Sequence, residues 1–214
     1  MPSTAYAEYQ KNLKDVHQLV LLHKSLSGHK PGKRSLGHLT RGGLLMLCAA
    51  WERYIETVAL EGAIFLTKNL SLYKDLPPNP KTKILGYVNN PKNTWTVADL
   101  GTPSWEKIYI EALKRKTESL NTPKHVNLKP LFEDFLGVPD IAGYWGGLHT
   151  EVDDFVTLRG EVAHRGGQSQ YIKFGKLTKL EWSVTDWVVK TDNGLSNHLN
   201  TLVTPNKRPW NRIL

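Results

Sequence analysis

An arginine and a histidine, Arg159 and His164, lie five positions apart in the segment Leu158–Gly167. Arginine is always charged and holds phosphate oxygens with a fork of N–H donors, whereas histidine exchanges protons near neutral pH. These are the two side chains that cleavage of RNA without a metal ion needs most. The spacing also arises by chance, so its meaning depends on the helix that carries it.

That helix is expected to run from about residue 150 to Arg165. Thr150 followed by Asp153 is typical of a capping arrangement, and Gly166-Gly167 is typical of a helix end. Arg159 falls on the apolar face, four residues after Phe155, where its charge must meet a carboxylate, an interface or a ligand.

Gly160 lies one turn before His164 and leaves space beside the imidazole for a ligand or a neighbouring helix. Two interpretations remain open. In the functional one, Arg159 and His164 act on a phosphate. In the structural one, Arg159 pairs with Glu52 or Glu56, and His164 caps carbonyl groups at the helix end.

The apolar periodicity predicts an all-α bundle of four or five principal helices in a single domain over residues 1–214. The expected helices cover residues 4–27, 38–68, 104–120 with Ser104 as cap, about 150–165, and 177–203. Residues 76–147 are interpreted as a loop-rich insertion. Within it, we expect one short helix before Pro103 and a short apolar piece, Leu131–Leu136.

The 214 residues carry a formal net charge of +8, which favours an anionic partner such as nucleic acid. The basic residues expected to follow an RNA backbone are Lys33, Arg34, Arg41, Lys114, Arg115, Lys116 and Arg165. Tyr171 and Trp182 are candidates for stacking on unpaired bases, whereas Trp187 lies on an apolar stripe and is expected in the core.

The only cysteine, Cys48, lies in an apolar run and is expected in the core. A single cysteine excludes an intrachain disulfide and a cysteine-rich zinc site, and we expect neither a metal nor a cofactor. The first residues lack the pattern of a signal peptide, and no apolar stretch reaches the ~20 residues of a membrane span. We therefore expect a cytoplasmic protein without a membrane partner.

The segment Leu158–Gly167 resembles the Arg-x4–6-His motif of the HEPN superfamily. The run Arg41–Phe65, with Trp51-Glu52-Arg53-Tyr54-Ile55-Glu56 at its centre and Glu61 after it, is similar to the second helix of the RiboL-PSP branch. The last helix, with Thr191-Asp192 and His198-Leu199, also resembles that branch.

The resemblance implies a compact helical domain that acts as a metal-independent endoribonuclease in toxin–antitoxin or antiviral defence. It also implies a homodimer that brings two motifs into one cleft, with an antitoxin or another defence protein as a further partner. Arg159 and His164 would be catalytic, and Glu52 would orient Arg159. The alternative is a non-catalytic module that binds RNA or protein; DNA binding without chemistry ranks last.

This chain departs from the family pattern at two positions. Family members commonly have asparagine, aspartate or another polar residue directly after the motif arginine, where this chain has Gly160. Some members have a tyrosine two residues after the histidine, which a partner nucleotidyltransferase modifies. Gly166 occupies that position here, so this regulation is not expected.

Overall fold

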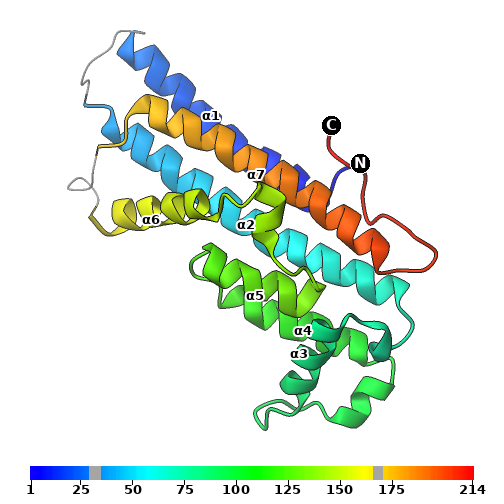
Figure 1. Ribbon diagram of the computed structural model, residues 1–214. Helices are drawn as coiled ribbons and strands as arrows, with labels where there is room; N and C mark the ends of the chain where they lie inside the picture. Colours follow the sequence, from blue (N-terminus) through cyan, green and yellow to red (C-terminus); the bar gives the residue numbers. More distant parts are fainter. Residues whose placement is uncertain (29–34, 166–170) are drawn as a thin grey trace.

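The computed structural model describes residues 1–28, 35–165 and 171–214, and these form seven α-helices without a strand (Figure 1). Three long helices build the main layer: α1 (Thr4–Ser27), α2 (Gly37–Asn69) and α7 (Phe174–Thr201). The predicted all-α fold is confirmed. None of the described helices is long and apolar enough to cross a membrane.

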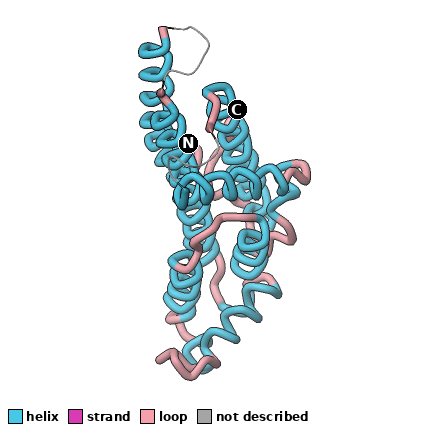
Figure 2. Tube along the Cα trace, turned by 90° about the vertical axis from the view of Figure 1, so that its left-hand side faces the viewer, coloured by secondary structure: helices cyan, strands magenta, loops and turns pink. Residues whose placement is uncertain are grey.

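The directions of the long helices follow from their contacts. Ser3 meets Asp192 and His17 meets Glu181, so α1 and α7 are antiparallel. Helix α2 runs back along α1 and parallel to α7, with Gly43 against Leu177. The end of α1 and the starts of α2 and α7 therefore lie at one end of the bundle (Figures 1 and 2).

Small residues on α2 permit this close packing. A Cβ atom at Gly43 would lie 2.8 Å from the Leu177 side chain, and one at Gly62 would lie 3.1 Å from Leu136 and 3.2 Å from Leu199. Any larger residue would push the neighbouring helices away, because protein cores have little free volume.

The centre of the core is aromatic. The Trp51 ring of α2 lies 6.2 Å from Tyr54, 5.8 Å from Trp145 and 6.1 Å from Trp187. Trp187 also packs 6.1 Å from Phe155 of α6 (His149–Arg165), which connects α2, α6 and α7. The prediction that Trp187 is a core residue is confirmed.

The middle region contains α3 (Pro78–Val88), α4 (Trp105–Glu118) and α5 (His125–Leu136), with two short 3-10 helices, Val97–Gly101 and Ile141–Trp145. Helices α4 and α5 pack on α2, α3 packs on α4 and α5, and all three share the hydrophobic core. The prediction of only a short apolar piece at Leu131–Leu136 was wrong, because α5 extends through Pro130 to His125. Proline normally interrupts a helix, and this biased the prediction toward a loop.

Two expected caps also differ in the structure. Ser104 precedes α4 but makes no side-chain capping bond. Thr150 lies inside α6, which begins at His149. The Asp153 carboxylate instead accepts the backbone N–H of His125 at 2.7 Å, so it caps the neighbouring helix α5.

The two chain ends meet beside a buried carboxyl group, Asp192. Ser3 caps α1 by accepting the Tyr6 N–H at 2.9 Å, and its hydroxyl donates to Asp192. Trp210 donates its indole N–H to the Asp192 carbonyl at 3.1 Å. Within the described part of the chain, the Asp192 Oδ2 atom has no hydrogen-bond partner. Burial raises the pKa of Asp192 to about 6, the Ser3 hydrogen bond lowers this pKa, and Glu61 raises it.

Replacing Asp192 by asparagine should change how stability depends on pH. The folded-state pKa lies above the unfolded one, so unfolding releases a proton, and the Asp192 contribution is lost as pH rises from about 4 to about 7. We expect wild-type protein to lose on the order of 2–3 kcal/mol from this group across that range. Urea unfolding at several pH values should show the loss in wild type and in an Asp186→Asn control, an exposed carboxyl on the same helix, but not in Asp192→Asn. Parallel curves for all three proteins would contradict the assignment.

Candidate active site

Arg159 and His164 both lie on α6, which runs along α2 toward the end of the bundle where α2 and α7 begin (Figure 1). The Arg159 side chain is partly buried on the side of α6 that faces α2, whereas His164 is exposed in the last turn. Five residues correspond to about 140° around a helix and ~7.5 Å along it. The two side chains therefore leave α6 in different directions.

Arg159 faces the Glu52 carboxylate of α2. Its Nη2 atom lies 3.8 Å from Oε2 of Glu52, with the two side chains 35% and 20% exposed. This distance is beyond a hydrogen bond, so the attraction is electrostatic and Glu52 does not use the guanidinium donors. The structure thus selects Glu52 over Glu56, whose carboxylate lies 3.8 Å from Arg53.

The environment of this pair has a low polarity. Burial raises the pKa of the Glu52 carboxyl, Arg159 lowers it, and Glu56 raises it. Burial also raises the pKa of the neighbouring Cys48 thiol to about 12, although Arg159 lowers it. Cys48 therefore remains a thiol at neutral pH, and its predicted place in the core is confirmed.

The space beside Gly160 is open. Among the described residues, no heavy atom lies within 4 Å of a Cβ atom built there, apart from the helix's own backbone and chain neighbours. A polar side chain, which the resembled family commonly has directly after the motif arginine, would fit here. A second molecule could also approach this side of α6.

Gly160→Ala should stabilise the protein by about 1 kcal/mol, because alanine favours a helix and meets no neighbour here. Thermal unfolding should show an increase of about 2–4 °C for a chain of this size. Gly194→Ala is the matched control, since its Cβ would lie 2.5 Å from the Tyr144 ring, and it should lower the melting temperature. A loss of stability for Gly160→Ala would show that this space is already filled.

Two of the predicted basic residues lie toward the same end of the bundle. Arg41 is in the second turn of α2, where its Nη1 atom and the Tyr171 ring would lie 3.1 Å and 3.2 Å from a Cβ at Gly37. Arg165 is exposed beside His164 at the end of α6. Lys33, Arg34, Gly166 and Gly167 lie outside the described residues.

The basic triplet Lys114, Arg115 and Lys116 lies elsewhere, on α4. Lys114 lines a groove with Thr67, which is 15 residues, or ~22 Å along α2, from Glu52. Within one molecule, the triplet is therefore separate from the Arg159 region.

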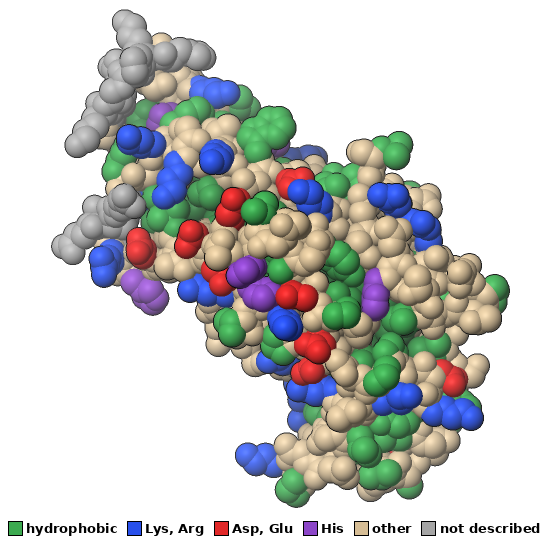
Figure 3. All heavy atoms as spheres, in the orientation of Figure 1, with side chains coloured by type: hydrophobic (Ala, Val, Ile, Leu, Met, Phe, Trp, Pro, Cys, Tyr) green, Lys and Arg blue, Asp and Glu red, His purple; other side chains and the backbone are tan. Residues whose placement is uncertain are grey.

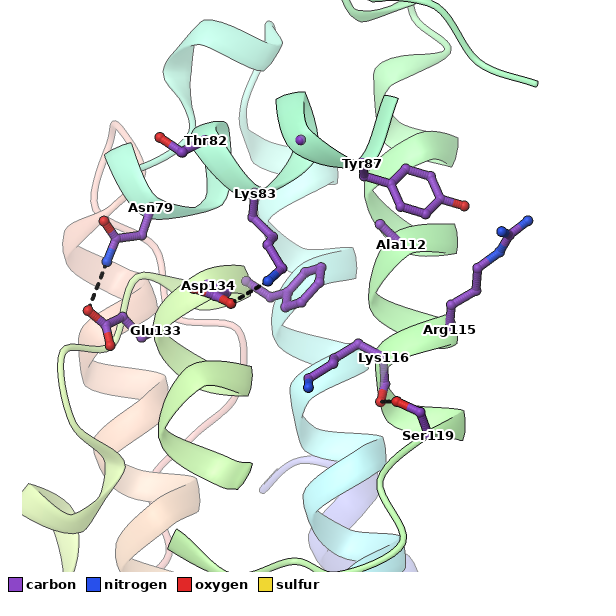
Figure 4. Close-up of a pocket in the computed structure, with 12 residues that line it drawn as sticks. Asn79, Thr82, Lys83, Tyr87, Ala112, Arg115, Lys116, Ser119, Glu133 and Asp134 are labelled. Carbon is purple, nitrogen blue, oxygen red and sulfur yellow. Dashed lines mark hydrogen bonds and ion pairs between the residues drawn. The ribbon is translucent and has the colours of Figure 1, made fainter. Parts of the chain in front are cut away.

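Arg115 and Lys116 instead line a groove of about 810 Å³ between α3, α4 and α5 (Figure 4). Its wall is held by Lys83 and Asp134 at 2.7 Å and by Asn79 and Glu133 at 3.1 Å. Arg115 points to the side and contacts Glu111 at 2.8 Å. These contacts account for much of the polar lining as structural pairs.

Three further basic residues, outside the set expected from the sequence, lie at the start of α7, where Lys173 is the N-cap. Lys173, Lys176 and Lys179 are exposed and recur at three-residue steps. Their three-residue spacing is visible in the sequence, although the apolar stripe dominates the pattern of this helix.

The geometry defines a helical bundle in which an exposed histidine follows an arginine that is held beside a glutamate. A family model described as RiboL-PSP-HEPN matches residues 7–210. The chain belongs to this HEPN family, whose domains are generally related to ribonucleases. No curated protein and no solved structure matches the chain.

Proposed function

We propose that this protein is a metal-independent RNA endonuclease with Arg159 and His164 as its catalytic residues. The observation that carries the proposal is the Arg159–Glu52 pair. The Glu52 carboxylate lies 3.8 Å from the guanidinium, so Glu52 leaves its donors unused, and His164 is exposed on the same helix. We infer that Glu52 helps to orient Arg159. Arg159 would offer a charged fork to a phosphate, and His164 would supply a proton carrier at the same end of α6.

The proposed reaction uses the 2′-hydroxyl of the RNA as the nucleophile. Its oxygen bonds to phosphorus while a histidine takes its proton, and the bond from phosphorus to the 5′-oxygen breaks. A second acid gives a proton to that oxygen, which leaves a 2′,3′-cyclic phosphate and a 5′-hydroxyl end. In the transition state, Arg159 would stabilise the negative charge on the non-bridging oxygens of the five-coordinate phosphorus.

One chain supplies only one motif histidine, so the proposal includes a homodimer with a composite site. The exposed position of His164 and the open space beside Gly160 are compatible with the approach of a second copy. His164 of that copy would be the second proton-transfer group.

The dimer makes cleavage depend on protein concentration. The rate per chain should fall when the protein is diluted below its dimer dissociation constant, because each monomer lacks one histidine. Cleavage assays and sedimentation over the same dilution series would check this. Undiminished activity per chain in a sample that sediments as a monomer would refute the composite site.

The basic residues Arg41 and Arg165 would contact the RNA backbone near the site. Lys33 and Arg34, which lie outside the described residues, are further proposed RNA contacts. Lys114, Arg115 and Lys116 would contact RNA only at a distance from the chemistry.

We further propose a cytoplasmic role in toxin–antitoxin or antiviral defence, with an antitoxin or another defence protein as partner. Toxicity on expression that His164→Ala relieves would support this role.

The basic test is incubation of RNA with the purified protein in EDTA, alongside Arg159→Ala and His164→Ala variants. Cleavage by wild type alone is expected. The second candidate is a non-catalytic module that binds RNA or protein, and the observation in its favour is that Arg159 already has a carboxylate partner. RNA binding by wild type without any cleavage would favour that candidate.

A further inference from the structure

One face of α7 exposes an aromatic side chain, Trp182. Trp182 is 76% exposed and is the most exposed aromatic residue in the described part of the chain. An exposed tryptophan offers a flat apolar face on which a ligand can pack.

Exposed lysines precede Trp182 at regular steps. Lys173, Lys176 and Lys179 lead to Trp182 with a rise of about 4.5 Å per step. In the view of Figure 3, Lys and Arg side chains gather over the start of α7. The lysines lie close to the positive end of the helix dipole, where cations are disfavoured.

The carboxylates in the same half of α7 are engaged in other contacts. Glu181 is buried and pairs with His17 of α1, and Asp186 pairs with Lys190 at 2.7 Å. The lysine row therefore keeps a positive potential that would attract an anion.

The row winds around α7, because each three-residue step turns by about 60°, and only its Lys176 end lies on the side that faces α6. Trp187 packs against Phe155 of α6, whereas Glu181 contacts α1. In projection down the helix, Lys176 lies about 20° and Lys179 about 80° from Trp187, and both lie more than about 130° from Glu181. Trp182 lies about 140° from Trp187. A polymer that follows the row therefore passes from the side of α7 near the helix with Arg159 and His164, at Lys176, to the side turned away from α6, at Trp182.

The surface of α6 itself would not attract such a polymer along its length. Its exposed residues include the acidic Glu151, Asp154 and Glu161. An anionic chain would therefore follow α7 and reach α6 only near its basic end at Arg165.

Aromatic rings also accompany cations at the start of α7. The Phe174 ring stacks on His23 at 4.7 Å, and the Lys24 ammonium lies 5.9 Å from the Phe174 centroid. This region combines positive charge with flat apolar surfaces, as in proteins that bind single-stranded nucleic acids.

We propose that Lys176, Lys179 and Trp182 bind an unpaired stretch of the RNA substrate, with a base stacked on Trp182 and phosphates on the lysines. An unpaired base offers its face to an aromatic ring, whereas the bases of a duplex are already stacked on each other. This inference rests on the proposed function, since it takes RNA as the ligand, and it adds that the substrate is single-stranded where it crosses α7.

The test measures binding of a labelled single-stranded RNA of about 12 nucleotides and of a duplex of the same length by fluorescence anisotropy. All proteins carry His164→Ala so that the RNA stays intact. Trp182→Ala should weaken single-strand binding by about tenfold, within the range for loss of one stacked base, and Trp182→Phe should retain most of it. Duplex binding should change little.

The lysines are tested by salt dependence. The double variant Lys176→Ala with Lys179→Ala should reduce the slope of log affinity against log salt by about 1.4, because each phosphate contact contributes ~0.7 for single strands. The matched control is Lys11→Ala with Lys14→Ala, which removes two exposed lysines from α1. Unchanged binding by Trp182→Ala, equal losses for duplex and single strand, or an equal effect of the control pair would overturn the inference.

The outcome is separable from that of the proposed function. Trp182-dependent binding of single-stranded RNA by a protein that never cleaves would support this site and refute the catalytic role. Cleavage of RNA by a protein whose RNA binding does not depend on Trp182 would support the catalytic role and refute this site. If both hold, Trp182→Ala in the otherwise wild-type protein should raise KM and leave kcat nearly unchanged.

Discussion

His164→Ala is expected to lower the rate of RNA cleavage by about two to four orders of magnitude. General acid–base catalysis contributes this much, and alanine cannot carry a proton. The loss should appear in kcat, because the imidazole transfers protons in the transition state and contributes little to binding of the substrate in the ground state. RNA binding by the variant should remain close to that of wild type.

His149→Ala is the matched control for this loss. His149 is an exposed histidine at the other end of the same helix, where its ring lies 4.8 Å from His125. Its removal should leave cleavage nearly unchanged. Equal losses for the two variants would mean that the rate reports damage to α6 and not the chemistry of His164.

Arg159→Lys is expected to lower cleavage by about two to three orders of magnitude even though it preserves the charge. Lysine is a point charge without the planar fork of donors that can hold two phosphate oxygens at once. The attraction to the Glu52 carboxylate should persist in part, so the fold should remain intact. Single-turnover cleavage together with thermal unfolding would separate the two effects.

A comparison of arginines makes this test sharper. Arg53 is exposed on α2 and lies 3.8 Å from Glu56, at the same distance as Arg159 from Glu52. Arg53→Lys should leave cleavage within about threefold of wild type, as expected for a surface pair of little energetic weight. Full activity of Arg159→Lys would show that only its charge is needed and would remove the role of the fork.

The long helices could be predicted because their signal is local. Apolar residues of α1, α2 and α7 recur at three- and four-residue steps, and the ends of α1 and α2 agree within one residue with the prediction. Pro130 hid the first turns of α5, and the partner of Asp153 could not be found, because His125 is 28 residues away in the chain. Such contacts depend on how helices pack and leave no periodic trace.

The same limit applies to the site. The pairing of Arg159 with a carboxylate was predictable from its apolar face, but the choice between Glu52 and Glu56 required the packing of α6 on α2. Charge alone grouped Lys114–Lys116 with the site, although α4 packs on the far half of α2. The lysines that precede Trp182 lie on the helix after the motif, and their charge alone did not predict an RNA contact.

We propose that this HEPN protein cleaves RNA with the substrate's own 2′-hydroxyl and without a metal ion. The most direct measurement compares an all-ribose oligonucleotide with its 2′-deoxy counterpart of the same sequence, both incubated with wild-type protein in EDTA. We predict that only the ribose strand is cut and that its fragments carry 2′,3′-cyclic phosphate and 5′-hydroxyl ends. An intact ribose strand, or equal cleavage of the deoxy strand, would contradict the claim.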